Sequence, residues 1–219
     1  AVTEIAADDG IRVLVVTGAG EIFCPGADLN NVGADSTIEQ EALQAKHFQI
    51  AAILHDMPQL SIAAVNGACA GAGFGWACGC DIRVASASAR FNTAFLNVAV
   101  AGDMGLPWSL PRLVGAAKAR ELSFFSEKID AEEALRIGLV ARVWPDEAFR
   151  QQLEDMLQTL IERSPTALRY MKAHYLAAES MPFDSYLQLE TERHMWISDG
   201  SHAREAFKAF IEKRKPQFD

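Results

Sequence analysis

The sequence predicts an α/β fold, and three observations support this prediction. Apolar runs of strand length, rich in β-branched residues, occur at residues 12–17, 61–65 and 81–85. Glycine-containing turns and a segment with helical spacing separate these runs, and strand, turn and helix recurring in this order are typical of an α/β architecture. The 219 residues, of which 50% are hydrophobic, are enough for one large domain or two small ones.

The first half of the chain is expected to alternate strands with helices. Residues 1–9 look like the end of a helix. The continuous apolar run at 12–17 is typical of a strand that is covered on both faces. Residues 39–55 carry apolar side chains at helical spacing and end before Pro58, so a helix is predicted there.

The stretch 60–80 has no charged residue, and a glycine stands at every fourth position from Gly67 to Gly79. Such a period also occurs where membrane helices dimerise. The strand-like start, the turn after residue 65 and the many small residues exclude a continuous membrane-spanning helix. We therefore expect the glycines to let a helix pack closely on a sheet.

The second half is predicted to be mainly helical. Asp130 and Glu133 have the spacing of a capping box at a helix start, and Gly138 ends this short helix. Further helices are expected at 146–164, 165–180, 182–198 and 201–214. The prediction is therefore an α/β core over residues 1–140 and a helical region over residues 141–219.

Charge and cysteine content narrow the function. The net charge of −9 argues against a general nucleic-acid or membrane-surface protein, because such proteins need clustered lysine and arginine. No secretory signal is recognised at the start of the sequence. The 4 cysteines lie in apolar surroundings without Cys-x-x-Cys spacing, so buried reduced thiols and a cytoplasmic location are expected. The 5 histidines have no metal-ligand spacing, and no metal is expected.

Two short turns are the strongest functional signal in the chain. They lie at 23–29, Phe-Cys-Pro-Gly-Ala-Asp-Leu, and at 66–75, Asn-Gly-Ala-Cys-Ala-Gly-Ala-Gly-Phe-Gly. Each follows an apolar strand-like run and is expected to open into a helix, whose first amides are unpaired and carry the positive end of the helix dipole. Glycine lets a reacting group approach the main chain closely. Two such turns together could hold one developing oxyanion.

A family resemblance extends over nearly the whole chain. It is carried by both turns in order, their spacing, the Leu-Pro-Arg-Leu-Val-Gly segment at 110–115 and the Phe/Lys pattern at 206–215. In these features the chain resembles the crotonase superfamily, which is the enoyl-CoA hydratase/isomerase family. The resemblance implies a spiral of repeated ββα units, followed by helices that build homotrimers, often dimers of trimers. Relatives normally carry further strands and a helix before this point, so we expect that residues precede this sequence.

The resemblance also implies roles for individual residues. The backbone N–H groups of Ala27 and Ala72 bind the thioester carbonyl of an acyl-CoA. Coenzyme A enters only as part of that substrate, and no tightly bound cofactor is implied. The substrate pocket that the resemblance implies contains Gly71, Gly73, Phe74, Gly75 and Phe95.

The coenzyme A part of the substrate has two implied contact regions. One is the main chain around Cys24, Ala27 and Asp28, although the side chain of Asp28 is expected to bond local amides, as aspartate in turns commonly does. The other is formed by Phe210 and Lys213, which match residues that contact adenine and phosphate, sometimes from a neighbouring subunit.

The acid and base groups distinguish between the reactions of the family. Family hydratases use two glutamates, whose positions fall here on Gly75 and Phe95, and neither of these residues can move a proton. Asp103 remains, and it matches the aspartate of family isomerases, among them dienoyl-CoA isomerases and the ring-epoxide isomerases of phenylacetyl-CoA breakdown. One base suffices for a 1,3-proton shift, and an apolar wall of Phe74 and Phe95 would raise its pKa.

Several alternatives stay open at this point. Asp103 could merely cap the helix that follows it. The chain could be a hydratase, or catalyse another acyl-CoA reaction, with a base that the sequence does not locate, or it could be a degenerate homologue that only binds acyl-CoA. Residues 16–20 could bind a dinucleotide, although they lack the third glycine and no clear helix follows them.

Overall fold

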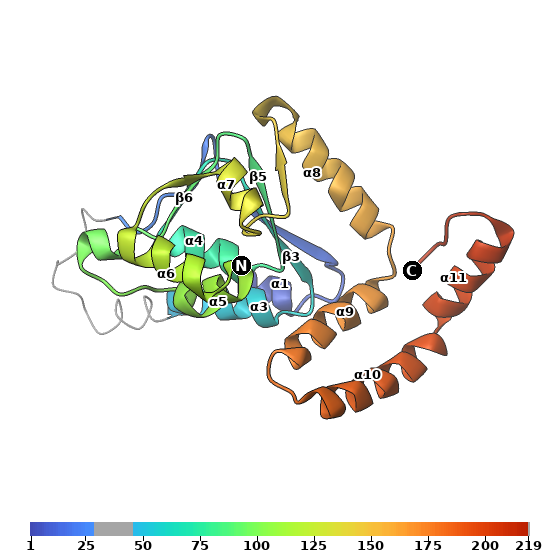
Figure 1. The fold of residues 1–219 in the computed structure, drawn as a ribbon. Coiled ribbons are helices and arrows are strands. Elements are labelled where there is room, and N and C mark those ends of the chain that lie inside the picture. The colour runs from blue at the N-terminus through green and yellow to red at the C-terminus, as the bar shows by residue number, and fades with distance from the viewer. Residues whose placement is uncertain (29–45, 219) are drawn as a thin grey trace.

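Two sheets of four strands form the frame of the protein (Figure 1). The computed structural model describes residues 1–28 and 46–218. The first sheet is entirely parallel and has the order β1 (Val13–Thr17), β3 (Leu60–Val65), β5 (Ile82–Ser86), β8 (Arg142–Trp144). The second has the order β2 (Ile22–Cys24), β4 (Ala68–Ala70), β6 (Arg90–Asn92), β7 (Ile129–Asp130), with β7 antiparallel to β6.

From β1 to β6, consecutive strands alternate between the two sheets, which produces a spiral. β1, β3 and β5 each lie in the first sheet, and the strand that follows each of them lies in the second. Helices return the chain to the first sheet, as α4 (Ala72–Gly79) does between β4 and β5. After β6 the chain forms the 3-10 helix η2 (Phe95–Val98), then α5 (Leu106–Val114) and α6 (Ala116–Phe125). The α/β prediction and the repeated ββα units are confirmed.

Apolar packing on both faces of the first sheet holds the fold together. The main core lies between the sheets and the helices α3 (Ile50–Asp56), α4 and α5, and a smaller cluster lies between the first sheet and α8 (Asp146–Ile161). Strand β1 is at the edge of its sheet, yet Leu14 packs toward the main core and Val15 toward the smaller cluster. Both faces of this strand are therefore covered, as predicted.

The predicted helices are present wherever the structure describes them. The first residues form α1 (Val2–Ala6), and the capping carboxylate of Asp130 accepts a hydrogen bond of 2.9 Å from the amide of Glu133 at the start of α7 (Ala131–Arg136). The helix expected at 39–55 is confirmed only in α3, because residues 29–45 lie outside the described residues. The helix expected after residue 29 lies outside them as well.

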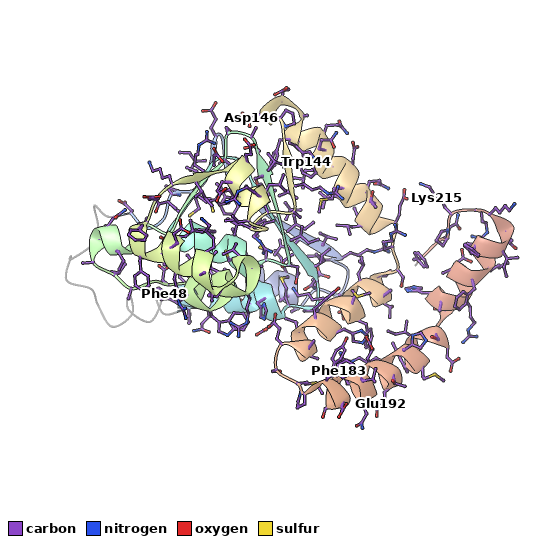
Figure 2. The ribbon with its side chains drawn as sticks, in the orientation of Figure 1. Phe48, Trp144, Asp146, Phe183, Glu192 and Lys215 are labelled. Atoms are coloured by element: carbon purple, nitrogen blue, oxygen red, sulfur yellow. The ribbon has the colours of Figure 1, made fainter. Side chains whose placement is uncertain are left out.

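The last helices leave the sheets and form an arm, which consists of α9 (Pro165–Ala178), α10 (Phe183–Ser198) and α11 (Ser201–Glu212) (Figure 1). Figure 2 shows the side chains of Phe183 and Glu192 on α10, and Phe183 is 72% exposed. In the parts of the chain that are described, no helix combines the length and apolar character needed to cross a membrane.

A buried ion pair fastens the start of the arm to the sheet. Lys172 of α9 is 5% exposed, and its Nζ lies 2.8 Å from Oδ2 of Asp81. The same ammonium donates to the carbonyls of Leu54 and Gln59, at 3.0 Å each. Asp81 also accepts from the amide and the hydroxyl of Ser61, so this aspartate has a structural role.

Replacing Lys172 with methionine removes this cation while keeping most of the stem. The carboxylate of Asp81 then stays partly buried without its counter-charge, so we expect the free energy of unfolding to fall by about 3 kcal/mol, measured by urea denaturation. Arg150→Met is the matched control, because Arg150 is 91% exposed and its pair with Glu154 contributes at most about 1 kcal/mol. Equal losses in both variants would contradict the prediction.

Candidate active site

The two predicted turns meet backbone to backbone. Strands β2 and β4 are parallel neighbours with Cys24 opposite Cys69, so both turns leave the same edge of the sheet. A Cβ atom added to Gly71 would lie 3.7 Å from Cα of Gly26, and one added to Gly26 would lie 3.9 Å from Cα of Gly71. Both glycines have positive φ, +104° at Gly26 and +52° at Gly71, which other residues rarely adopt.

Each turn carries one of the predicted amides next to this contact. Ala72 is the first residue of α4, and the first hydrogen bond of the helix runs from the amide of Gly75 to the carbonyl of Gly71, at 3.1 Å. The amides of Ala72, Gly73 and Phe74 therefore precede the hydrogen-bonded ladder of α4. Ala27 directly follows Gly26, so the structure brings the main chain of Ala27 and that of Ala72 to the same place.

Asn66 ties the start of the second turn to the loop before β2, a role that the sequence did not reveal. Its side-chain Oδ1 accepts from the amide of Gly18 at 3.0 Å, and its Nδ2 donates to the carbonyls of Gly18 and Gly20 at 3.1 and 2.8 Å. The Asn-Gly dipeptide was the only signal, and it indicated a turn rather than a clamp. The chain then enters strand β2 and not a helix, so the dinucleotide-binding alternative for residues 16–20 is wrong.

Asp103 stands in a tight turn between η2 and α5. Gly102, Met104 and Gly105 have φ of +120°, +47° and +70°. The N-cap of α5 is Gly105, and no side chain caps this helix, so the alternative that Asp103 is a helix cap is wrong. Burial raises the pKa of the Asp103 carboxyl. Its Oδ1 is buried and has no hydrogen-bond partner among the residues the structure describes.

The Asp103 turn packs against the same helix that provides the amide of Ala72. A Cβ atom added to Gly75 would lie 2.4 Å from Cβ of Met104 and 3.4 Å from the carbonyl oxygen of Asp103. The turn therefore fills the space beside Gly75, where a side chain would otherwise stand.

Further residues of the predicted pocket gather around the two turns. A Cβ atom on Gly73 would lie 2.8 Å from Sγ of Cys24, and one on Gly71 would lie 3.9 Å from the ring of Phe95. Asp28, next to Ala27, is exposed. Cys24 is half-buried, whereas Cys69, Cys78 and Cys80 are buried, and all four thiols are free.

Three of the predicted site residues lie elsewhere. Phe74 is 1% exposed in the main core, where its ring centroid lies 5.7 Å from that of Phe91, so it is a core residue rather than a pocket wall. Phe210 and Lys213 belong to α11 and its C-terminal cap, at the far end of the arm from α4 (Figure 1). Within one chain the structure does not bring these two together with the turns.

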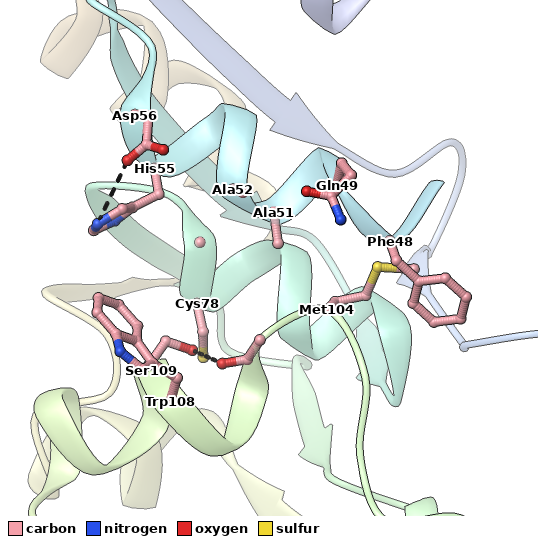
Figure 3. A pocket seen from close by; sticks show the side chains of 12 residues that line it. Phe48, Gln49, Ala51, Ala52, His55, Asp56, Cys78, Met104, Trp108 and Ser109 are labelled. Atoms are coloured by element: carbon pink, nitrogen blue, oxygen red, sulfur yellow. Dashed lines mark hydrogen bonds and ion pairs between the residues drawn. The ribbon is translucent and has the colours of Figure 1, made fainter. Parts of the chain in front are cut away.

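A cavity of about 460 Å³ opens beside the Asp103 turn, between α3, α4 and α5 (Figure 3). Phe48, His55, Met104 and Trp108 are among the residues that line it, and the ring centroids of His55 and Trp108 lie 5.3 Å apart. His55 Nε2 lies 3.1 Å from Oε2 of Glu179, the C-terminal cap of α9. Among the described residues, no group of three or more His, Cys, Asp and Glu side chains could hold a metal ion. The sequence carried no signal for this cavity, because three separate helices form it.

Comparison with known proteins gives a match over the whole sequence. A family model described as enoyl-CoA hydratase/isomerase matches residues 1–219. A probable enoyl-CoA hydratase of Rhodobacter capsulatus is 35% identical over 207 residues, covering 94% of this chain and 80% of that protein. The 1,2-epoxyphenylacetyl-CoA isomerase of Escherichia coli is 34% identical over 219 residues, covering 98% of this chain and 84% of that protein. The crystal structure of an enoyl-CoA hydratase from Bacillus anthracis has a TM-score of 0.93 at 29% identity. The match covers 99% of this chain and 84% of that one.

Replacing Asp103 with asparagine tests the environment of this carboxyl. Because its pKa is raised in the folded protein, the ionised carboxylate lowers stability above the folded pKa, and this cost disappears below the unfolded pKa. We expect the variant to melt at a higher temperature than wild type at about pH 7, with the gain vanishing toward about pH 3. Thermal unfolding across this range measures it.

Asp146→Asn is the control of opposite sign. A hydrogen bond from the backbone amide of Ser88, 3.0 Å long, lowers the pKa of Asp146. This variant should therefore lose stability at neutral pH and approach wild type in acid. A gain for Asp103→Asn that is independent of pH would show that the carboxyl is not desolvated.

Proposed function

The chain belongs to the enoyl-CoA hydratase/isomerase family, and from this premise we propose that it shifts the double bond of an enoyl-CoA thioester. The reaction passes through an enolate whose oxygen is held by the amides of Ala27 and Ala72, and Asp103 moves the proton. The observation that carries the proposal is the meeting of the two turns at Gly26 and Gly71, with the turn that bears the partly buried Asp103 carboxyl packed against the same helix.

The two amides supply the electrostatic part of the mechanism. When a carbon of the enoyl chain loses its proton, negative charge moves through the conjugated system to the thioester oxygen. Fixed N–H donors stabilise this charge more than they stabilise the neutral carbonyl, so they lower the barrier rather than merely bind substrate. The N-terminus of α4 adds the positive end of its dipole at the same place.

Asp103 supplies the proton transfer. Its carboxylate removes a proton from one carbon, and the same group, now protonated, returns that proton to another carbon of the chain, so the product is an isomer. The raised pKa supports this role, because a carboxylate with greater proton affinity is a better base toward a carbon acid. Gly75 and Phe95 stand where family hydratases have their glutamates. Of positions 75, 95 and 103, only 103 therefore carries a base.

Coenzyme A and the assembly complete the proposal. The main chain around Cys24, Ala27 and Asp28 contacts the coenzyme A part of the substrate. Phe210 is 85% exposed on α11, far from the turns of its own chain, so we propose that Phe210 and Lys213 reach the site of another copy. The helical region 141–219 then serves oligomerisation, as a homotrimer or a dimer of trimers. The free thiols support a cytoplasmic location.

A second candidate is water addition, and the names of relatives favour it. The Rhodobacter capsulatus relative is called a probable enoyl-CoA hydratase. Hydration requires a group that activates water besides the group that delivers the proton. Crotonyl-CoA hydration at a rate equal to or above the isomerisation rate would favour this candidate over the isomerase.

Asp103→Asn should abolish most of the isomerase activity. We expect kcat for conversion of 3-enoyl-CoA to 2-enoyl-CoA to fall at least about 100-fold with little change in KM, because the amides still bind the carbonyl. In wild type kcat/KM should rise with pH through an apparent pKa above the ordinary aspartate range, since the carboxylate is the active form. An unchanged rate in the variant would refute Asp103 as the base.

Ala72→Pro tests the amide without removing a side-chain group. Ala72 is the first residue of α4, a position where proline fits the helix, and proline has no N–H. We expect kcat to fall by about 100- to 1,000-fold, the usual effect of losing one oxyanion donor. Ala72→Gly keeps the amide and is the matched control, with kcat near that of wild type. Equal activity of the two variants would contradict the proposed role.

A further inference from the structure

Gly75 makes an unusually close contact with the turn that carries Asp103. A Cβ atom at position 75 would lie 2.4 Å from Cβ of Met104 and 3.2 Å from the carbonyl oxygen of Met104. The Cβ atom of Met104 is fixed by its backbone, so rotation of the Met104 side chain cannot relieve this contact. Only a residue without a side chain lets α4 and this turn approach so closely.

The residues on both sides of Met104 contact the first residues of α5. A displacement of Met104 would therefore also move Asp103. The carbonyl of Asp103 accepts a hydrogen bond of 2.9 Å from the amide of Leu106, which is 1% exposed. On the other side, a Cβ atom at Gly102 would lie 2.8 Å from Cγ of Pro107. The turn is thus held at both ends by α5, and α4 supports it at Met104.

Resting on the proposed function, we propose that Gly75 is a positioning residue for Asp103. The absent side chain at position 75 seats Met104 against α4, and this contact sets where the Asp103 carboxylate stands relative to the amide of Ala72. The same contact makes two arrangements mutually exclusive. In this backbone a carboxylate can come from position 103 or from a side chain at position 75, because the latter would need the space of Met104. The contact between Gly75 and Met104 thereby excludes a carboxylate at position 75 while Asp103 keeps its place.

The test introduces a Cβ atom at position 75 and asks whether removal of the opposing Cβ of Met104 restores activity. Gly75→Ala adds the Cβ atom and should displace the turn, lowering kcat for 3-enoyl-CoA isomerisation by about 100-fold with a smaller change in KM. The double variant Gly75→Ala with Met104→Gly removes the opposing Cβ, and it should recover most of the lost kcat. Gly75→Ala with Met104→Ala keeps that Cβ and is the matched control, which should stay impaired.

A second readout does not depend on turnover. The pKa of the Asp103 carboxyl, followed by NMR titration with Asp103→Asn as reference, should move in Gly75→Ala and return in the double variant with glycine. Gly79 lies on α4 as Gly75 does. Gly79→Ala places a Cβ 3.0 Å from the carbonyl oxygen of Ala51 in α3 and should leave this pKa unchanged. If Gly75→Ala alone fails to fold, folding of the glycine double variant but not of the alanine double variant supports the proposal.

The outcomes separate this inference from the proposed function. Wild-type kcat and Asp103 pKa in Gly75→Ala, or equal rescue by glycine and alanine at position 104, would overturn the role of Gly75. Loss of activity in Asp103→Asn would still support the isomerase. If wild type shows no isomerase activity while the Asp103 pKa follows the expected pattern, the proposed function fails and the positioning contact stands.

Discussion

The backbone contact between Gly26 and Gly71 is the constraint on which the rest of the site depends. The two residues stand where neighbouring parallel strands end, and each has a positive φ that glycine adopts without strain. A side chain on Gly26 would lie 3.4 Å from the carbonyl oxygen of Ala70, between the two turns. The nearness of Ala27 to Ala72 therefore follows from strand register and from the positive φ of the two glycines, with Asn66 holding the loop before β2 in place.

Helix α4 carries this constraint to the other parts of the site. Gly73 contacts Cys24, Gly75 contacts Met104 and Gly79 contacts Ala51, so three neighbouring segments approach the helix backbone itself. Glycine inside a helix costs about 1 kcal/mol relative to alanine. Burial of Phe74 and Ala77 in the main core offsets part of that cost. A helix with ordinary side chains would stand farther from β2 and from the Asp103 turn, and its first amides would move with it.

Local signals were sufficient for the elements and insufficient for the contacts between them. The apolar run at 12–17 and the cap at Asp130 each depend on neighbours in sequence, and both predictions hold. The glycine period predicted close packing, but its partner at Met104 depends on how a distant turn folds. Phe74 was placed in the pocket by resemblance, whereas the helix directs its ring toward Phe91 in the core. The partners of Asn66 likewise depend on strand register, which no local pattern encodes.

The turn around Asp103 carries backbone strain and a desolvated carboxyl, and both features bear on its function. Met104 has a left-handed φ, a strain on the order of 1 kcal/mol for a residue other than glycine. The carboxyl is desolvated, and its buried Oδ1 has no partner among the described residues. Neither feature stabilises the fold, and both persist because Met104 and Leu106 are packed around them. A capping carboxylate would accept amide hydrogen bonds and its pKa would fall. A raised pKa instead keeps the proton affinity that a carbon base needs, so the structural cost of this turn is consistent with a chemical role.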